Sequence, residues 1–576
     1  LENGANSSFV NQINDPNVKI DELISDPLEK AISFNYESHP NIPLPQDILK
    51  EERKNSLGMD ISDSITVSQL ANDIKKFSEK KRQIGPIIDG QSLFDDAKFT
   101  EVVNPAHLEH VIGEVSNTTS DQALNALEIA HSAFTKWQNV SAVERAKYLE
   151  KAADLLEERM KELIYILIVE AGKILSDAIA EVREAVDFLR YYAMIAKNEL
   201  SDWKKLPGPT GEDNFIFFEG RGVFLCISPW NFPLAIFIGQ VSAALAAGNA
   251  VLAKPAEQTP IIAYKAIKIL HEAGIPKNVL HLIPGDGGYL GKTLVPDNRI
   301  AGVAFTGSTQ TAQIINKMLA NRDGPIVPLI AETGGLNAMI VDSSALLEQV
   351  AMDALLSAFR SSGQRCSALR VLFIQEDIAE KQIKMICGAA QELKIGDPIQ
   401  LSTDIGPIID KASIDMLTQH TQEMSEDKNS NLLFKVPMDA NSHNGHFFPP
   451  YIYEIQKISQ LKQEVFGPIL HIIRFNKSQL NEVISDINNT GYGLTFSLQS
   501  RIQSQIDTIS KKISVGNVYI NRNQIGAAVG IQPFGGRGLS GTGPKAGGPH
   551  YLQRFSTEKV VSVNTTAFGG NTTLMC

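Results

Sequence analysis

Short apolar segments alternate with helix-like segments through the middle of the chain, and this alternation limits the fold more than any other feature. Apolar runs occur at 223–228, 250–253, 279–283 and 300–305, separated by stretches such as IIAYKAIKILHEAG with apolar residues every three or four positions. Strands that alternate with helices favour a parallel sheet covered by helices on both faces. Such sheets bind ligands at the carboxyl ends of their strands.

A second alternating series extends over residues 337–521, with NAMIVD, RVLFIQ and NVYINR as its expected strands. Two such series in one chain of 576 residues predict an α/β protein with two lobes. Cys366 belongs to the second lobe.

The segments before the first series differ from it. Residues 121–198 carry apolar side chains at helical spacing, and ERAKYLEKAADLLEERMKELIYILIVEAG is expected to be one helix. Ser120–Asp121 and Ser141 are expected to cap two helices, and Gly172 to end the second. Closely spaced prolines in SHPNIPLPQDIL favour an extended path, so residues 1–80 are interpreted as a linker or arm.

Composition excludes several classes of protein. A formal net charge of −12 argues against a general nucleic-acid-binding surface. No apolar run is long enough for a membrane span, and the first residues lack the pattern of a secretory signal. The absence of Met at position 1 suggests a piece of a longer protein. The chain has four cysteines, Cys226, Cys366, Cys387 and Cys576. They are too few and too scattered for a disulfide framework, which indicates a reducing compartment. They also lack the spacing of a zinc site, so no metal site is expected.

Polar residues follow the expected strands of the first lobe. Asn231, in PWNFP, offers an amide donor for an oxyanion, although a turn residue is the simpler reading. Lys254 and Glu257, in KPAEQTP, have the spacing to hold the two hydroxyls of a ribose, although a solvated surface pair is the alternative. Ser308, in FTGST, opens a helix and suits a pyrophosphate. No GxGxxG follows any of these strands, so a dinucleotide would need a different loop.

Two further residues complete a chemical set. Cys366 lies among small residues in GQRCSA, where a thiol can serve as a nucleophile; a lone cysteine is otherwise most often a buried structural residue. Glu332 stands beside two glycines, which leave room for a base that moves. A thiol, an amide donor, a mobile base and a phosphate-ready helix start are the needs of an aldehyde oxidised through a covalent thioester.

The motifs PWNFP, KPAEQTP, FTGST, ETGG, GQRC and EVFGP occur in the order that is typical of the NAD(P)-dependent aldehyde dehydrogenase superfamily, which the chain resembles over about 95–560. The resemblance implies an atypical Rossmann-type cofactor domain, a catalytic domain and a β-flap that builds oligomers. It implies that Cys366 is the nucleophile, Asn231 the oxyanion donor and Glu332 the base. A carboxylate at Glu257 would repel a 2′-phosphate, so NAD is the expected cofactor. The residues expected to contact it are Ile227, Ser228, Pro229, Trp230, Lys254, Glu257, Thr306, Gly307, Ser308, Glu464 and Phe466.

Within the superfamily, the chain is most similar to the 1-pyrroline-5-carboxylate dehydrogenases, especially the C-terminal half of bacterial bifunctional proline utilisation proteins. The segments that carry this likeness are GANSSFVNQI, PLPQDIL, RKNSLGMDISD, SGTGPKAGGP and NTTAFGGNTTLM. The implied substrate is glutamate-γ-semialdehyde, whose α-carboxylate would be held by two backbone N–H groups and a hydroxyl. Its expected contacts are Ser367, Gly547, Gly548, Phe232, Phe555 and Glu184.

The resemblance also implies a division of the chain and a set of partners. Besides the small-molecule substrate, the expected partners are a proline dehydrogenase domain in the parent chain and a second copy in a homodimer or larger assembly. The expected location is the cytoplasm, or the cytoplasmic face of a membrane that the missing half of the parent protein would contact. The alternatives are a dehydrogenase for another carboxylated aldehyde, such as succinic semialdehyde, and a non-catalytic scaffold. The expected division is a barrel remnant with linker arm at 1–80, an NAD-binding domain at 81–205 and 221–332, a catalytic domain at 333–530, and a β-flap with tail at 206–220 and 531–576.

Overall fold

The computed structural model describes residues 12–37, 42–49, 52–94, 99–438 and 444–568. The chain forms two compact units, Leu1–Leu57 and Gly58–Cys576. No helix in the described part of the chain is long and apolar enough to cross a membrane. Most of the expected barrel remnant GANSSFVNQI and the end of the tail NTTAFGGNTTLM lie outside the described residues. The first unit contains α2 (Ile20–Leu23), α3 (Pro27–Ser33) and the 3₁₀ helix η1 (Pro45–Asp47).

The second unit begins at Gly58, earlier than the end of the linker arm predicted at residue 80. Helix α4 (Ser64–Ser78) lies within it, although the sequence placed residues 1–80 in an arm. Asp63 caps α4 by accepting hydrogen bonds from the first-turn N–H groups, and Leu70 is only 2% exposed. Phe77 at its end packs near Tyr165, with ring centroids 6.3 Å apart. A helix with one apolar face is stabilised by this packing, which a count of prolines and charges does not reveal.

A seven-stranded sheet forms the centre of the first lobe, and five of its strands are parallel. The register aligns the ends of these strands: Thr306 pairs with Glu332, and Ile227 pairs with both Phe305 and Lys254. The expected strands are therefore confirmed. In spatial order the strands are β12 (Leu329–Glu332), β11 (Ile300–Thr306), β8 (Val223–Ile227), β9 (Ala250–Lys254), β10 (Leu280–Leu282), β2 (Ile87–Ile88) and β3 (Gln91–Ser92).

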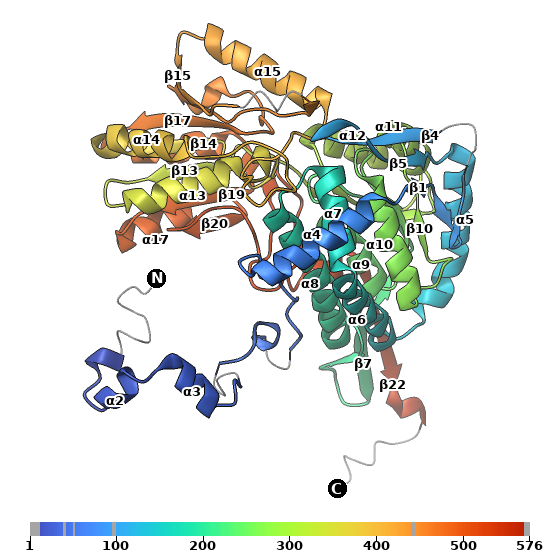
Figure 1. Cartoon of the computed structure of the whole chain (residues 1–576). Helices are drawn as coiled ribbons and strands as arrows, with labels where there is room; N and C mark the ends of the chain where they lie inside the picture. The colour runs from blue at the N-terminus through green and yellow to red at the C-terminus, as the bar shows by residue number, and fades with distance from the viewer. Residues whose placement is uncertain (1–11, 38–41, 50–51, 95–98, 439–443, 569–576) are drawn as a thin grey trace. The chain divides into compact units, whose positions relative to one another are not determined.

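Helices pack on both sides of this sheet (Figure 1). Ser141 caps α6 and Gly172, at a φ of 65°, ends α7, as expected. The expected single helix is two, because the chain leaves helical geometry at Arg159. Thr119, and not Ser120 or Asp121, caps α5, because its side chain and that of Gln122 bond each other's backbone N–H. The helices are α5 (Ser120–Gln138), α6 (Ala142–Glu158), α7 (Met160–Ala171), α8 (Leu175–Glu199), α9 (Ala235–Ala246), α10 (Pro260–Ala273), α11 (Gly287–Leu294) and α12 (Thr309–Ala320).

A second seven-stranded sheet forms the other lobe, drawn in yellow and orange in Figure 1. Its strands are parallel except β15, and its three predicted strands are confirmed. The spatial order is β15 (Ser430–Lys435), β16 (Tyr451–Ile455), β17 (Ile469–Phe475), β14 (Val371–Gln375), β13 (Ala338–Val341), β19 (Thr495–Gln499) and β20 (Asn517–Ile520). The helices of this lobe are α13 (Leu347–Phe359), α14 (Glu376–Ala390), α15 (Lys411–Glu426), α16 (Leu480–Asn489) and α17 (Gln503–Lys512).

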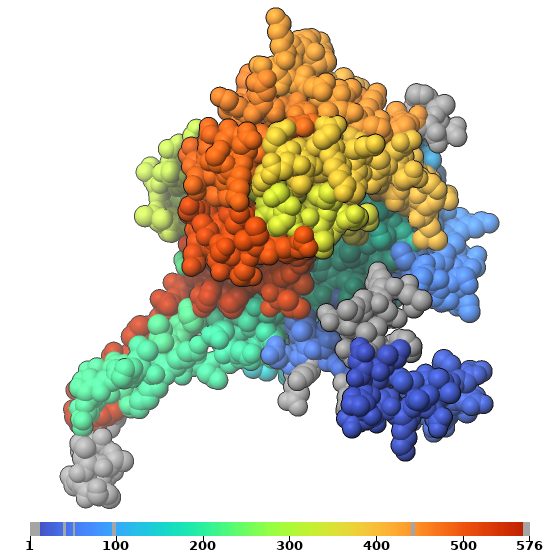
Figure 2. All heavy atoms as spheres, turned by 90° about the vertical axis from the view of Figure 1, so that its left-hand side faces the viewer, coloured from blue at the N-terminus to red at the C-terminus, as the bar shows by residue number. Residues whose placement is uncertain are grey.

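A small antiparallel sheet projects from the second unit, and Figure 2 shows it as an arm directed away from the two lobes. Its strands β22 and β7 pair along their whole lengths. This sheet contains β22 (Ser556–Asn564), β7 (Glu212–Gly220) and β6 (Lys204–Leu206), and a further three-stranded sheet contains β1 (Gln83–Ile84), β5 (His107–Ser116) and β4 (Phe99–Asn104).

Candidate active site

A cavity of about 500 Å³ lies where residues of the two lobes meet. It is lined by groups that follow the strand ends of the first lobe and by the loop before β14 in the second. The cavity thus brings together residues that are far apart in the sequence, as parallel strands with a common edge predict. The sequence-predicted residues that line it are Glu184, Pro229, Trp230, Asn231, Phe232, Thr306, Gly307, Ser308, Glu332, Cys366, Ser367, Glu464 and Phe466.

Cys366 lies on a tightly held loop. The Asn337 amide donates to the carbonyl oxygens of Cys366 and Ala368 at 2.6 and 2.9 Å. Just upstream, Ser361 and Ser362 adopt the left-handed conformation, with φ of 55° and 57°. Burial, together with the nearby carboxylates of Glu464 and Glu332, raises the pKa of the Cys366 thiol to about 12. The thiol is therefore protonated in this state and needs a base when it reacts.

Asn231 faces the same loop. Its Nδ2 donates to the carbonyl oxygen of Gln364 at 3.1 Å, two residues before the cysteine. An amide nitrogen has two hydrogens, so the other is available for a ligand oxygen. Phe232 is held between two cations, with Lys173 Nζ 3.9 Å and the Arg365 guanidinium 5.3 Å from the ring centroid. The arrangement fixes both an amide donor and an apolar wall.

Glu332 ends β12 and has a buried carboxylate. It accepts a hydrogen bond from the Gly536 N–H at 2.8 Å, while its Oε1 has no partner among the described residues. Burial raises its pKa to about 8. A Cβ at Gly535 or Gly541 would come within 2.7–2.8 Å of this carboxylate, so both positions must be glycine to leave it room. A base with this pKa titrates near neutral pH.

Glu464 and Phe466 form another part of the cavity wall. Arg370 pairs with Glu464 at 3.0 Å and lies 5.3 Å from the centre of the Phe466 ring. The Trp230 and Phe466 rings meet edge to face, with centroids 5.6 Å apart. A Cβ at Gly334 would overlap the Glu464 carboxylate, so the glycine permits this close approach. The result is an aromatic wall beside a fixed carboxylate.

The expected ribose and pyrophosphate groups lie along the edge of the first sheet. Lys254 Nζ donates to Glu257 at 3.0 Å, and the same carboxylate oxygen accepts from the Gly287 N–H at 2.6 Å. Ser308 caps α12, where its hydroxyl accepts from the Thr311 N–H at 3.1 Å. Ser308 therefore lies at a helix start, a position whose backbone N–H groups can bind a phosphate. Lys254, Glu257, Ile227 and Ser228 do not line the cavity itself.

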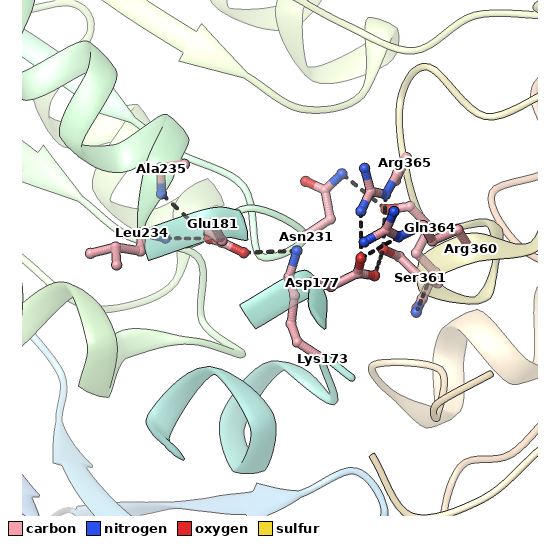
Figure 3. Close-up of polar contacts among 10 residues, drawn as sticks. All are labelled: Lys173, Asp177, Glu181, Asn231, Leu234, Ala235, Arg360, Ser361, Gln364 and Arg365. Carbon is pink, nitrogen blue, oxygen red and sulfur yellow. Dashed lines mark hydrogen bonds and ion pairs between the residues drawn. The ribbon is translucent and has the colours of Figure 1, made fainter. Parts of the chain in front are cut away.

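Charged side chains from α8 connect the two loops of the cavity (Figure 3). Asp177 pairs with Arg360 and Arg365, at 2.5 and 3.0 Å, and Glu181 pairs with Lys173 at 2.8 Å. Burial alone would raise the pKa of Asp177, but the positive charges of Arg365, Arg360 and Lys173 hold it well below its ordinary value. The Asp177 carboxylate is therefore ionised at neutral pH.

Glu184 lies one helical turn after Glu181 on α8 and lines the cavity, as predicted from the sequence. Burial and the neighbouring Glu181 carboxylate raise its pKa to about 7. Phe188 and Tyr551 also line the cavity. Among the described residues, no group of three or more His, Cys, Asp or Glu side chains is arranged to hold a metal ion.

Three expected substrate contacts lie away from the cavity. The Gly547 N–H donates to the Tyr192 hydroxyl at 2.9 Å, and the Gly548 N–H to the Lys545 carbonyl at 3.2 Å, so neither is free for a carboxylate. Phe555 is fully buried against Phe224, with ring centroids 4.8 Å apart. The sequence could not show this, because the acceptor of the Gly547 N–H is the hydroxyl of Tyr192, which is far away in the sequence.

Several cavity residues were missed by the sequence interpretation, among them Gly526, Ala527 and Phe534. They lie near Ser367 in the loop GAAVGIQPF, whose only sequence signal is a glycine followed by small residues. Gly526 has a φ of 76°, and no atom lies within 4 Å of where its Cβ would be. In the described part of the chain, the backbone N–H groups of Gly526 and Ala527 have no hydrogen-bond partner, so they can bind a ligand anion.

Known proteins resemble this chain over most of its length. The model described as "Aldehyde dehydrogenase family" matches residues 94–561. Bifunctional protein PutA of Salmonella typhimurium is 45% identical over 581 aligned positions, covering 98% of this chain and 43% of that protein. The 1-pyrroline-5-carboxylate dehydrogenase of Geobacillus sp. is 37% identical over 482 positions, covering 83% of this chain and 92% of that protein. A crystal structure of bifunctional proline utilization A (PutA) matches with a TM-score of 0.86 and 49% identity, over 99% of this chain and 54% of that chain. The chain thus spans about half the length of its PutA relatives, or less.

Proposed function

The chain belongs to the aldehyde dehydrogenase family and has its fold, and from this premise we propose that it oxidises L-glutamate-γ-semialdehyde to L-glutamate with NAD. One observation carries the proposal: a single cavity contains the Cys366 thiol, the Asn231 amide and the Glu332 carboxylate, with the Ser367 side chain and the unpaired N–H of Gly526 at its wall. The relatives named 1-pyrroline-5-carboxylate dehydrogenase support the choice of substrate.

In the proposed reaction, Cys366 Sγ attacks the aldehyde carbon and forms a thiohemiacetal. The oxyanion accepts hydrogen bonds from Asn231 Nδ2 and from the Cys366 backbone N–H. The thiol must lose its proton as it attacks, because its pKa is about 12, and this proton passes to solvent water, so that Glu332 stays ionised for the second step. After the hydride has left, Glu332 removes a proton from the water that hydrolyses the thioester, and the thiol is restored.

The residues present fit a dinucleotide. A carboxylate and an ammonium 3.0 Å apart, Glu257 and Lys254, suit the two ribose hydroxyls, and the start of α12 at Ser308 suits a pyrophosphate. The Trp230 and Phe466 rings offer an aromatic wall for the nicotinamide, and Glu464 suits its ribose. When bound, NAD supplies the acceptor for the hydride.

A comparison of substrates tests this function. We expect kcat/KM for glutamate-γ-semialdehyde to exceed that for succinic semialdehyde, and NAD to be used in preference to NADP because Glu257 repels a 2′-phosphate. The measurement is initial NADH or NADPH formation with each pair of substrates. A preference for succinic semialdehyde would overturn the substrate, and no turnover of any aldehyde would support a non-catalytic scaffold.

Replacing Ser367 with alanine should raise KM for glutamate-γ-semialdehyde by about 10- to 100-fold, the cost of one hydrogen bond to a charged group. KM for a simple alkyl aldehyde such as propanal should stay nearly constant, because it has no α-carboxylate. Steady-state kinetics with both aldehydes measure this. Ser413→Ala, at another serine of the cavity, is the matched control. Equal effects on both aldehydes would contradict carboxylate binding at Ser367.

The division of the second unit also belongs to this proposal. An NAD-binding domain at 81–205 and 221–332 and a catalytic domain at 333–530 agree with the two seven-stranded sheets. A flap at 206–220 and 531–576 that joins two or more copies is supported by the projecting β6–β7–β22 sheet, where Val560 is 57% exposed. A proline dehydrogenase domain in the same parent chain is proposed because the relatives that carry the PutA name are described as bifunctional.

A further inference from the structure

Helix α8 carries two buried carboxylates one helical turn apart, and each holds a different loop of the cavity (Figure 3). Asp177 contacts the segment before Cys366, and Glu181 contacts the segment after Asn231. The two side chains are only 1% and 0% exposed. Buried carboxylates contribute little to stability compared with apolar side chains of similar size, so their value lies in what they orient.

Asp177 fixes the segment that leads to the nucleophile. Its carboxylate accepts from the Ser361 hydroxyl and pairs with the guanidinium groups of Arg360 and Arg365. Ser361 and the residue after it adopt the left-handed conformation, which is unfavourable for a residue with a side chain. Such a conformation persists only when surrounding contacts hold it. Asp177 supplies three of these contacts from the opposite lobe.

Glu181 fixes the segment that follows the oxyanion donor. Its Oε1 accepts from the Leu234 N–H at 2.9 Å and lies 3.4 Å from the Ala235 nitrogen, at the start of α9. Its Oε2 pairs with the buried Lys173. The unpaired N–H groups of a helix start favour a carboxylate at this position. Because Leu234 follows Asn231 closely in the chain, this contact also limits the position of the amide.

The two loops meet at one hydrogen bond, from Asn231 Nδ2 to the carbonyl oxygen of Gln364. Since the carboxylates that hold the loops stand on a single helix, the distance between the loops is set by the rigid spacing of Asp177 and Glu181. We propose that Asp177 and Glu181 are positioning residues that align the Asn231 amide with the Cys366 backbone N–H and sulfur. The inference rests on the proposed function, in which these groups bind the developing oxyanion.

The first test uses near-isosteric substitutions. Asp177→Asn and Glu181→Gln should each lower kcat for aldehyde oxidation by about 10- to 100-fold, because small misplacements of reacting groups have effects of this size. The Kd for NAD should stay within about twofold, since neither residue contacts the cofactor groups. Glu199→Gln, on the exposed end of α8 where Glu199 pairs with Lys204, is the matched control and should leave kcat unchanged.

A double-mutant cycle separates positioning from a structural role. If Glu181 acts through Asn231, then Glu181→Gln should cost less than about threefold in kcat when Asn231→Ala is already present. Full additivity of the two effects would overturn the inference, as would single variants as active as the wild type. A structural defect would lower the folded fraction and would still multiply with the loss from Asn231→Ala.

A milder variant keeps the test valid if Asp177→Asn does not fold. Ser361→Ala removes one hydroxyl, leaves the ion pairs of Asp177 in place, and should lower kcat several-fold without changing the Kd for NAD. An unchanged kcat in this variant would contradict the role of Asp177 in holding the left-handed segment. Failure of the proposed function is distinguishable from failure of this inference, because in that case the wild-type protein itself would oxidise no aldehyde.

Discussion

Replacing Cys366 with alanine should lower NADH formation from glutamate-γ-semialdehyde by a factor on the order of 10⁴ or more, because the covalent route through the sulfur disappears. NAD should still bind with nearly the same Kd, since the cofactor groups at Lys254 and Glu257 are on the edge of the first sheet, outside the cavity that contains the thiol. Initial rates and equilibrium binding measure the two quantities on the same preparation.

Cys387→Ala is the matched control, because Cys387 is a half-buried thiol on α14 outside the cavity. It should retain full activity. Alkylation by iodoacetamide gives a second reading: the high pKa of Cys366 predicts slow modification at neutral pH that accelerates as the pH rises. Activity retained by Cys366→Ala would remove the nucleophile from the proposed mechanism.

The positions of the cavity residues from the first lobe could be predicted from the sequence because they depend on the ends of parallel strands, whereas Cys366 lies in the loop before β14. A short apolar strand followed by a polar residue places that residue at the edge of the sheet, whatever the rest of the chain does. Glu332 and Thr306 are direct neighbours in this row, and Ile227 and Lys254 continue it. The missing GxGxxG did not prevent this interpretation, because the strand order alone brings these ends together.

The substrate loop could not be predicted in the same way. The glycines of SGTGPKAGGP looked free to bind a carboxylate, but the Tyr192 hydroxyl accepts the Gly547 N–H from a helix far away in the sequence. The unpaired N–H groups belong to Gly526 and Ala527, in a loop that carries no periodic pattern. Whether a backbone group is satisfied depends on tertiary contacts that a local motif does not contain.

The burial of the two α8 carboxylates could not be predicted from the sequence either. In the sequence, Asp177 and Glu181 look like ordinary charged positions of an amphipathic helix, which are usually solvated. Both are buried because the loops before Cys366 and after Asn231 pack against this face of the helix. The charged face of a helix is therefore evidence of exposure only when no second lobe covers it.

The pKa of Glu332 also affects stability. Burial raises it from 4.5 to about 8, so between these values the unfolded chain is ionised at this residue while the folded chain keeps the proton. The stability from the protonated form is present below about pH 4.5 and is lost as the pH rises towards 8. Glu332→Gln removes this pH-dependent contribution to stability, so ionisation at position 332 cannot unfold the variant at pH 8.

With Glu332 replaced by glutamine, the enzyme should release a burst of about one NADH per Cys366 and then turn over about 10²- to 10⁴-fold more slowly, because the thioester forms but no base activates water. Hydroxylamine, a nucleophile that needs no such base, should restore turnover. Stopped-flow absorbance of NADH measures both phases. In the wild type, the slow phase should accelerate as the pH rises to about 8, where the carboxylate ionises, and then level off. A glutamine variant that keeps this pH dependence, or that shows neither burst nor hydroxylamine rescue, would contradict Glu332 as the deacylating base.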